Sequence, residues 1–384
     1  MKLLVLGWYY SSNLGDAVIC DCVADMLRSH YPQAQICIRD IVGHSAFPKN
    51  EITDLNVLDQ QRRRQRLRIL ATRLGWDKQL CHRQWYLDYF REEIDRLGSE
   101  DCDAVVFAGG QMFMDDLALY VEALTARFSA RNIPVFFNAC GTGPSWSRAI
   151  RSRLGKALSG DSVKLVSCRD DTALVDRWCG KGDGFVIPTA DPALEASRIY
   201  GVSRDPNAET VGLGVLFPFS LEPRLVMSFW RRLIRQLERQ HIPWKLFTNG
   251  SGADTAFARK ILNSLPELSG QTEKRLCPPP QTPRELVQTI AQFKSLISFR
   301  LHSHILACSL DIPTVALVWD RKVPLFFEKI GQPERCLPLK ASPKRVLQTL
   351  EQAEKVGYDR EKITAQSDRA QALLLDSLDG ILRG

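Results

Sequence analysis

Short apolar runs alternate with longer segments of helical periodicity along most of the chain. The runs lie at 2–8, 103–110, 134–143, 163–170 and 184–194, and in the second half of the chain at 211–217, 244–252, 295–300 and 314–320. Helical periodicity is clear at about 16–29 and, near the C-terminus, at 323–330 and 360–382. Strands that are apolar throughout and alternate with helices are typical of parallel sheets covered on both faces. The pattern therefore predicts an α/β protein.

The two series of strands are separated near residues 200–207, and 384 residues exceed the usual size of a single core. We therefore expect two doubly wound, Rossmann-like parallel-sheet domains facing a cleft, at 1–203 and 208–358. The remaining segment, 359–384, is expected to form a helix that packs back on the first domain. In such sheets ligands bind at the carboxyl ends of the strands, so the loops after the strands are the places to look for chemistry.

The composition, 45% hydrophobic and 25% charged, is that of an ordinary globular protein. The apolar run at the N-terminus is too short for a signal peptide, and no window is long enough to span a membrane. These features predict a cytoplasmic protein. The eleven cysteines show no C-x-x-C or zinc spacing, so no metal site is expected. The net charge of +7 favours anionic partners, and on charge alone phosphorylated metabolites, membrane surfaces and nucleic acid all stay open.

Three glycine-containing loops follow predicted strands. In the first, Gly15 permits a tight turn and Asp16 can cap the next helix, whose free N–H groups suit an anion or a polar sugar. Its spacing matches neither G-x-G-x-x-G nor the P-loop. The loops at 108–116 and 138–144 carry glycines that allow a ligand close to the backbone. A purely structural turn is an equally good interpretation of each loop.

Cationic side chains stand at two other strand ends. Arg169 directly follows the strand at 163–167, where its guanidinium fits a carboxylate or phosphate, although most such arginines are solvated or paired with an acid. Arg300 and His302 interrupt a strongly apolar pattern and, in an extended segment, would project to one side. If a helix starts at His302, its imidazole lies at the positive end of that helix and has a lowered pKa. His304 faces elsewhere.

Together these motifs resemble the polysaccharide pyruvyl transferase family. The matching segments are NLGD (13–16), GGQ (109–111), SCRD (167–170), ADPAL (190–194), SFRLHSHILACSLDIPTVAL (298–317) and DRK (320–322). The R-L-H segment with its following helix and Ile-Pro is the most specific of them. Gln111 stands where the family more often has a third glycine.

The resemblance implies an enzyme that moves the enolpyruvyl group of phosphoenolpyruvate onto sugar hydroxyls, usually closing a pyruvate ketal. The acceptor would be a polysaccharide or its lipid-linked or nucleotide-linked precursor, bound mainly by the first domain, on a fold similar to B-type glycosyltransferases. It implies that His302 is the general acid and that Arg169, Arg300 and the Leu301 backbone bind the donor. Phosphoenolpyruvate is then a co-substrate, and neither a cofactor, a metal nor nucleic acid is expected.

The resemblance also indicates further substrate-binding positions. They are Asn13, Gly15, Asp16, Gly109, Gly110, Gln111 and Lys322. The base for the acceptor hydroxyl is not evident: Asp16, Asp115 and Asp116 are candidates by position only, and helix capping is the expected duty of Asp16.

Residues 59–93 are the most charge-biased segment. An apolar stripe of Leu67, Leu70 and Leu74 is surrounded by arginines, and Trp76, Trp85, Tyr86 and Tyr89 are also part of the segment. A basic amphipathic helix of this kind can lie on an anionic membrane surface, which would place the protein at the inner face of the plasma membrane. The alternative is an ordinary solvated helix packed on the first domain.

Two other functions fit the same fold. One is a nucleotide-sugar-dependent glycosyltransferase, in which Arg300 and His302 would serve a diphosphate. The other is a catalytically silent glycan-binding protein, against which the joint presence of Arg169, Arg300 and His302 argues.

Overall fold

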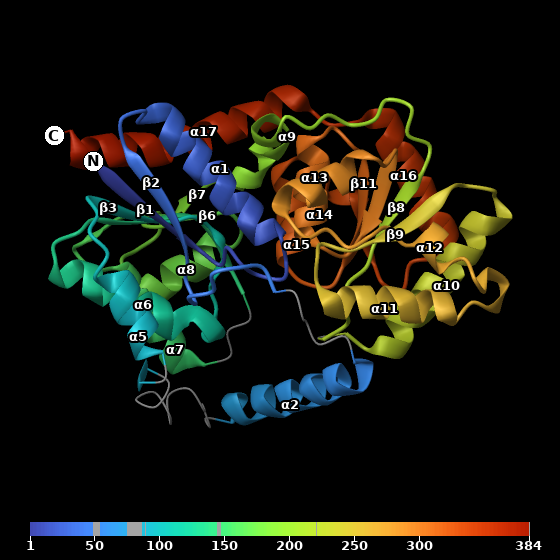
Figure 1. The fold of residues 1–384 in the computed structure, drawn as a ribbon, viewed down its shortest axis with the longest axis horizontal. Coiled ribbons are helices and arrows are strands. Elements are labelled where there is room, and N and C mark those ends of the chain that lie inside the picture. The colour runs from blue at the N-terminus through green and yellow to red at the C-terminus, as the bar shows by residue number, and fades with distance from the viewer. Residues whose placement is uncertain (49–53, 75–86, 89, 144–146, 220, 384) are drawn as a thin grey trace.

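The computed structural model describes residues 1–48, 54–74, 87–88, 90–143, 147–219 and 221–383. They form two α/β domains that lie side by side (Figure 1). The first sheet has the order β2-β1-β3-β5-β6-β7, with β4 paired to β5, and the second has the order β12-β11-β10-β8-β9. The described pairings between these strands are parallel. The expectation of two doubly wound parallel-sheet domains is confirmed.

The strands are short, as expected for buried parallel sheets. Those of the first sheet are β1 (Lys2–Gly7), β2 (Gln35–Asp40), β3 (Ala104–Phe107), β4 (Gly110–Phe113), β5 (Val135–Thr142), β6 (Val163–Cys168) and β7 (Ile187–Pro188). Those of the second are β8 (Val211–Gly214), β9 (Trp244–Phe247), β10 (Ser295–Ser298), β11 (Thr314–Val318) and β12 (Cys336–Pro338).

Helices connect the strands and cover both faces of each sheet (Figure 1). In the first domain they are α1 (Gly15–His30), α5 (Arg91–Gly98), α6 (Asp115–Ala130), α7 (Arg148–Leu158), α8 (Thr172–Cys179) and α9 (Ala196–Tyr200). In the second they are α10 (Pro223–Arg239), α11 (Gly252–Asn263), α12 (Thr272–Arg275), α13 (Pro283–Ala291), α14 (Leu301–Ser309), α15 (Lys322–Lys329) and α16 (Pro343–Val356). Two more stand apart from this scheme, α2 (Leu55–Arg73) and α17 (Arg360–Leu382).

The apolar strands are explained by burial on both faces. In β1, Leu4 and Leu6 pack into the core on one side of the sheet, while Leu3 and Val5 pack into the core on the other. Alternate residues of a strand point to opposite faces, so a strand between two layers of helices must be apolar at every position.

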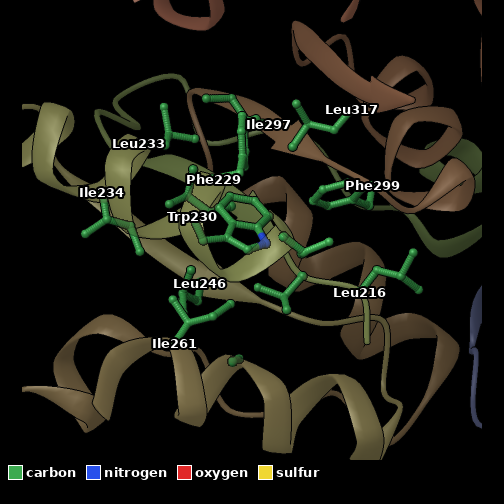
Figure 2. Packing of buried hydrophobic residues seen from close by; sticks show 14 of the residues in the cluster. Leu216, Phe229, Trp230, Leu233, Ile234, Leu246, Ile261, Ile297, Phe299 and Leu317 are labelled. Carbon is green, nitrogen blue, oxygen red and sulfur yellow. The ribbon is translucent and has the colours of Figure 1, made fainter. Parts of the chain in front are cut away.

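The second domain follows the same rule. Figure 2 shows Phe229 and Trp230 of α10 packed among Leu246, Ile297 and other side chains of one core of this domain. The other core contains residues of both domains, among them Leu14 and Val18 from the first and Ile305 from the second. A shared apolar contact therefore holds the domains together beside the strand ends.

Three observed strands, β2, β4 and β12, were not expected from the sequence. In β2 five of six residues are only partly buried or exposed, so the strand lacks an apolar run. β4 has four residues and begins with Gly110, and β12 has three and ends with Pro338. A strand at the edge of a sheet, or one that contains glycine or proline, lacks the continuous apolar run by which strands are predicted from sequence.

The C-terminal helix α17 lies against the first sheet. Leu374 and Leu378 join the core that contains Leu3 and Val5, and Asp379 accepts a hydrogen bond of 2.6 Å from the Tyr31 hydroxyl at the end of α1. The chain thus returns from the second domain and contacts both domains. No helix in the described part of the chain is long and apolar enough to cross a membrane.

The helix α2 packs on the second domain, contrary to the expectation that it would pack on the first. Leu58 is buried in the core of the second domain, and Arg62 donates from Nη1 to the carbonyl oxygen of Leu221 at 3.2 Å. The aromatic residues Trp76, Trp85, Tyr86 and Tyr89 lie outside the described residues.

Candidate functional site

The site is built around His302, at the point where β10 ends and α14 begins. The helix starts at Leu301, and Arg300 precedes it in an extended conformation with φ −79° and ψ 123°. The extended-segment argument for Arg300 and His302 therefore does not describe their geometry. His302 is instead in the first turn of the helix and is only 5% exposed. Figure 1 shows α1, α14 and α15 meeting between the two sheets.

Two side chains of the first domain contact the His302 ring, one at each nitrogen. Asn13 Nδ2 lies 3.3 Å from Nδ1, and Arg169 Nη1 lies 3.2 Å from Nε2. A guanidinium can only donate, so Nε2 accepts this hydrogen bond and carries no proton. The imidazole is therefore held by the domain opposite its own.

The loop before α1 comes close enough to His302 that only glycine fits at one position. A Cβ atom added to Gly15 would lie 2.3 Å from the Cγ and Nδ1 atoms of His302. The preceding residue, Leu14, donates its N–H to the carbonyl oxygen of Asn249 at 3.0 Å. Gly15 thus allows the start of α1 to approach the ring across the domain boundary.

Asp16 does not cap α1, contrary to the expectation from its position. The N-cap residue is Leu14, which makes no side-chain capping bond. Asp16 accepts a hydrogen bond of 3.2 Å from Asn13 Nδ2, the atom that also lies against His302. Burial raises the pKa of Asp16, against the opposing effect of Arg169, Lys322 and Arg300. A carboxyl group with a raised pKa next to an imidazole is suited to proton transfer.

Arg169 lies at the end of β6, as the sequence indicated, and its side chain is almost completely buried. It forms an ion pair with the buried carboxylate of Asp191. Burial lowers the pKa of Arg169, but Asp191, Asp170 and Asp16 raise it by more, so the guanidinium stays charged. Its Nε atom is buried without a hydrogen-bond partner in the described part of the chain. That N–H is available to an anion.

Glycine also makes room for Arg169. A Cβ atom at Gly141, in the predicted loop at 138–144, would lie 2.9 Å from Arg169 Nε and 2.8 Å from an oxygen of Asp170. Asp170 in turn accepts hydrogen bonds of 2.9 Å from the backbone N–H and the hydroxyl of Thr142. The third glycine loop thus supports the arginine rather than contacting His302.

Arg300 is bound within its own domain. Its Nε donates to Asp254 Oδ2 at 2.9 Å, and Asp254 is fully buried. The side chain of Arg300 keeps 19% exposure, and its charge reaches His302, whose pKa it helps to lower. Arg300 therefore contributes positive charge at the edge of the site while one carboxylate orients it.

Lys322 is the third cation, at the start of α15. Its Nζ lies 4.9 Å from the centre of the Trp319 ring. Burial lowers the pKa of Lys322 to about 8, although Asp320 opposes the shift. Lys322 and Leu301 line a small cavity between the domains together with Arg169. The structure thus brings the predicted donor-binding residues Arg169 and Leu301 together with Lys322, which was predicted as a further substrate-binding position.

The loop at 108–116 is placed beside Asp16 rather than beside His302. Gly109 and Gly110 have φ angles of 117° and 79°, which favour glycine. A Cβ atom at Gly110 would lie 3.2 Å from an Asp16 oxygen. Gln111 donates from Nε2 to the Thr142 carbonyl at 3.3 Å, so its amide is engaged in the first sheet.

Asp115 and Asp116 begin α6 at the end of the same loop. Asp115 accepts a hydrogen bond of 3.2 Å from the backbone N–H of Ser147. No contact between either aspartate and His302 is found among the described residues. This leaves Asp16 as the candidate base that adjoins the imidazole.

The pKa of His302 is lowered well below its usual value of 6.5. Burial is the largest cause, followed by the positive charges of Arg169, Lys322 and Arg300. The imidazole is therefore neutral at pH 7 in the absence of an anion. His304 is separate from the site: its Nε2 lies 3.1 Å from the Ser298 carbonyl, and burial lowers its pKa to about 3.

Several residues that support the site were not singled out from the sequence. Lys329 of α15 donates from Nζ to the carbonyl oxygens of Arg169, at 2.7 Å, and of Thr189, at 3.1 Å. Asn249 accepts from the Ser303 hydroxyl at 2.9 Å as well as from Leu14. Asp191 and Ser303 lie in the matched segments 190–194 and 298–317, but the resemblance assigned neither residue a role or a partner.

The site therefore combines three cations, one neutral imidazole and one buried carboxyl group with a raised pKa. Around them, Arg169 Nε, Asn13 Oδ1 and Asn249 Nδ2 are buried polar atoms that lack a hydrogen-bond partner within the described ranges. Buried polar atoms are usually satisfied, so these three indicate a polar ligand at this position. Among the described residues no group of three or more His, Cys, Asp and Glu could hold a metal ion.

The whole chain is similar in fold to solved structures of proteins bound to UDP or UDP-GlcNAc. S. aureus MnaA in complex with UDP has a TM-score of 0.58 and 11% identity, covering 100% of this chain and 97% of that chain. UDP-GlcNAc 2-epimerase from Neisseria meningitidis bound to UDP-GlcNAc has a TM-score of 0.59 and 11% identity, covering 98% and 99%. At these identities the likeness shows the fold alone, and it confirms the glycosyltransferase-B-like arrangement.

Comparison of sequences gives a more specific result. The family model described as "Polysaccharide pyruvyl transferase" matches residues 13–321. The match spans both domains and includes every residue placed in the site except Lys322 and Lys329. No curated protein sequence matches the chain.

Proposed function

The chain belongs to the polysaccharide pyruvyl transferase family, and on that premise we propose that it transfers the pyruvyl group of phosphoenolpyruvate to sugar hydroxyls. The acceptor is a polysaccharide or its lipid-linked or nucleotide-linked precursor, and the product is a cyclic pyruvate ketal. One observation carries the proposal: His302 accepts a hydrogen bond from Arg169 at Nε2 and lies against the Asn13–Asp16 pair, in a buried and cationic site.

The charge of the site suits this donor. Phosphoenolpyruvate has a carboxylate and a phosphate, and fork-shaped guanidinium groups bind both kinds of anion. Arg169 supplies the unpartnered Nε, Lys322 supplies a buried ammonium, and Arg300 supplies a further guanidinium at the edge. The N-terminus of α14, beginning at Leu301, adds backbone N–H groups that favour an anion.

The donor itself makes His302 an acid. In the empty site the three cations keep the imidazole neutral, and a bound anion of opposite charge raises its pKa. Donor oxygens also compete with Nε2 for the Arg169 N–H groups, which frees Nε2 to hold a proton. A positioned acid of this kind contributes about 10²–10⁴-fold to the rate.

The reaction then proceeds in two additions. His302 protonates the methylene carbon of the donor, and the adjacent carbon becomes electrophilic. A sugar hydroxyl attacks that carbon while Asp16 takes the hydroxyl proton. The carbon–oxygen bond to phosphate breaks and a second hydroxyl closes the ketal. The two hydroxyl protons balance the proton gained by the methyl group and the proton that leaves with phosphate.

The test is a screen of glycan precursors with phosphoenolpyruvate, monitoring phosphate release and the mass of the acceptor. We expect phosphate release that depends on acceptor, and an acceptor that gains one pyruvyl group. His302→Asn should lose turnover while still binding the donor. Turnover of a nucleotide sugar without phosphoenolpyruvate would instead favour a glycosyltransferase, and a chain that binds glycan but turns over neither donor would be a silent member.

A further inference from the structure

The helix α2 has two faces of different character. Leu58 and Arg62 face the second domain: Leu58 is 3% exposed and Arg62 bonds to the Leu221 carbonyl. Arg63, Leu67, Leu70 and Leu74 follow one another at spacings of four, three and four residues, which places them together on another face. At about 3.6 residues per turn, that face is turned by roughly 120° from the docked one.

The outward face exposes large apolar side chains. Leu67, Leu70 and Leu74 are 68%, 56% and 73% exposed, the three most exposed leucines among the described residues. A surface helix of a soluble domain normally turns its leucines toward the core. Here Leu58 packs into the core of the second domain, whereas the three exposed leucines contribute nothing to the packing of α2 on that domain.

Positive charge surrounds the same stripe. The helix contains six arginines and one aspartate. Arg63 continues the line of leucines, while Arg64 and Arg66 lie on its two sides, and all three are exposed. The apolar stripe and its arginines thus form one surface, the α2 outer face, defined by Arg63, Arg64, Arg66, Leu67, Leu70 and Leu74.

We infer that the α2 outer face binds the surface of a bilayer that contains anionic phospholipid. Leucine side chains enter the boundary between head groups and acyl chains, and the arginines contact the phosphate groups, which is the combination found in interfacial helices. A nucleic acid would match the arginines but not the leucines. Figure 1 shows α2 along the lower edge of the molecule, away from both sheets, so that the helix can lie on a membrane without displacing either domain.

The experiment is flotation of the purified full-length protein with vesicles of equal parts phosphatidylglycerol and phosphatidylcholine, and with vesicles of phosphatidylcholine alone. We expect binding to the anionic vesicles that weakens at high salt. Changing Arg63, Arg64 and Arg66 to Gln should weaken it by roughly 100-fold, since each basic residue near an anionic surface contributes appreciably. Changing Leu67, Leu70 and Leu74 to Gln should reduce binding to a similar degree, by about 100-fold, because the apolar contact is lost.

A matched control lies on α10. Leu225 is 52% exposed, and Arg224 and Arg232 are exposed beside it. Changing these three to Gln removes an exposed leucine and two charges elsewhere and should leave flotation unchanged. All the variants alter exposed side chains, so circular dichroism and thermal unfolding should match those of the unchanged protein.

The inference is overturned if the unchanged protein does not float with anionic vesicles, or if flotation is unaffected by both α2 variants. It is also overturned if the control variant loses binding as the α2 variants do. Dimers that dissociate in the leucine variant, without vesicle binding, would assign the face to a second copy of the chain and also overturn it. The assay contains neither donor nor acceptor, so its result is independent of the proposed transfer reaction.

Discussion

His302 should become protonated when phosphoenolpyruvate binds. The empty site lowers the pKa of this imidazole well below 6.5 through burial and through Arg169, Lys322 and Arg300, so the ring is unprotonated at about pH 7. The donor brings about three negative charges into the same site. A group whose pKa is higher in the complex than in the free protein takes up a proton on binding.

The expected size of the effect follows from the charges. One opposite charge about 4 Å from the ring contributes about 4 kcal/mol at an effective dielectric constant of about 20, or roughly three pKa units. Uptake should therefore approach one proton per donor at a pH between the free and the bound pKa values of His302. At about pH 7 Lys322, with a pKa of about 8, is about one-tenth neutral and adds little. Between the free and bound pKa values of His302, the Kd of the donor should rise about tenfold per pH unit.

Calorimetric titration in buffers of different ionisation enthalpy measures this uptake directly. The slope of binding enthalpy against buffer ionisation enthalpy gives the number of protons. His302→Asn should abolish the uptake while donor binding persists, and Asp16→Asn should retain it. Donor binding by the unchanged protein without proton uptake would show that His302 stays neutral in the complex, and full uptake by His302→Asn would assign the proton to another group.

Three substitutions test the geometry of the site. Gly15→Ala places a Cβ atom 2.3 Å from the His302 ring and should lower kcat by roughly 100-fold, as a misplaced catalytic group does; Gly380→Ala, at a helical glycine with open space around it, should keep full activity. Arg300→Lys should weaken donor affinity in calorimetry about tenfold, because one ammonium cannot serve Asp254 and the donor together; an unchanged Kd would remove Arg300 from the site. Lys329→Met removes the hydrogen bonds that the carbonyl groups of Arg169 and Thr189 accept from this side chain and should raise KM for the donor about tenfold. Lys329→Arg should bring KM part of the way back toward that of the unchanged protein. Equal kinetics in the unchanged protein, Lys329→Met and Lys329→Arg would show that Lys329 does not position Arg169.

Most of the fold could be predicted because its strands are apolar on both faces. In β1 and β10 every residue is at least partly buried, and β10 is buried throughout, so the apolar runs mark the strands closely. The edge strand β2 could not be predicted this way, since its side chains are only partly covered. The packing of α2 on the second domain could not be predicted from the pattern either, because only two isolated apolar residues, Leu55 and Leu58, make this contact with residues far along the chain.

The sequence predicted which residues of the site stand at the ends of strands, but not the contacts that these residues make across the domain boundary. His302 and Arg169 stand out because an ionisable side chain that is buried at the end of an apolar strand must have a partner or a ligand. Their mutual contact at 3.2 Å spans 133 residues of sequence, and no local pattern specifies it. The position of Asp16 indicated a helix cap, whereas the observed bond to Asn13 depends on how the loop before α1 closes over His302.

The fate of the donor methylene in deuterated water tests proton transfer from His302 to the donor most directly. If His302 delivers a solvent-exchangeable proton to that carbon, the pyruvyl group on the acceptor sugar should carry a methyl with solvent deuterium, seen by mass spectrometry and NMR. His302→Asn should yield neither product nor label. An acceptor product that keeps its methylene, or a methyl group free of deuterium, would contradict the account.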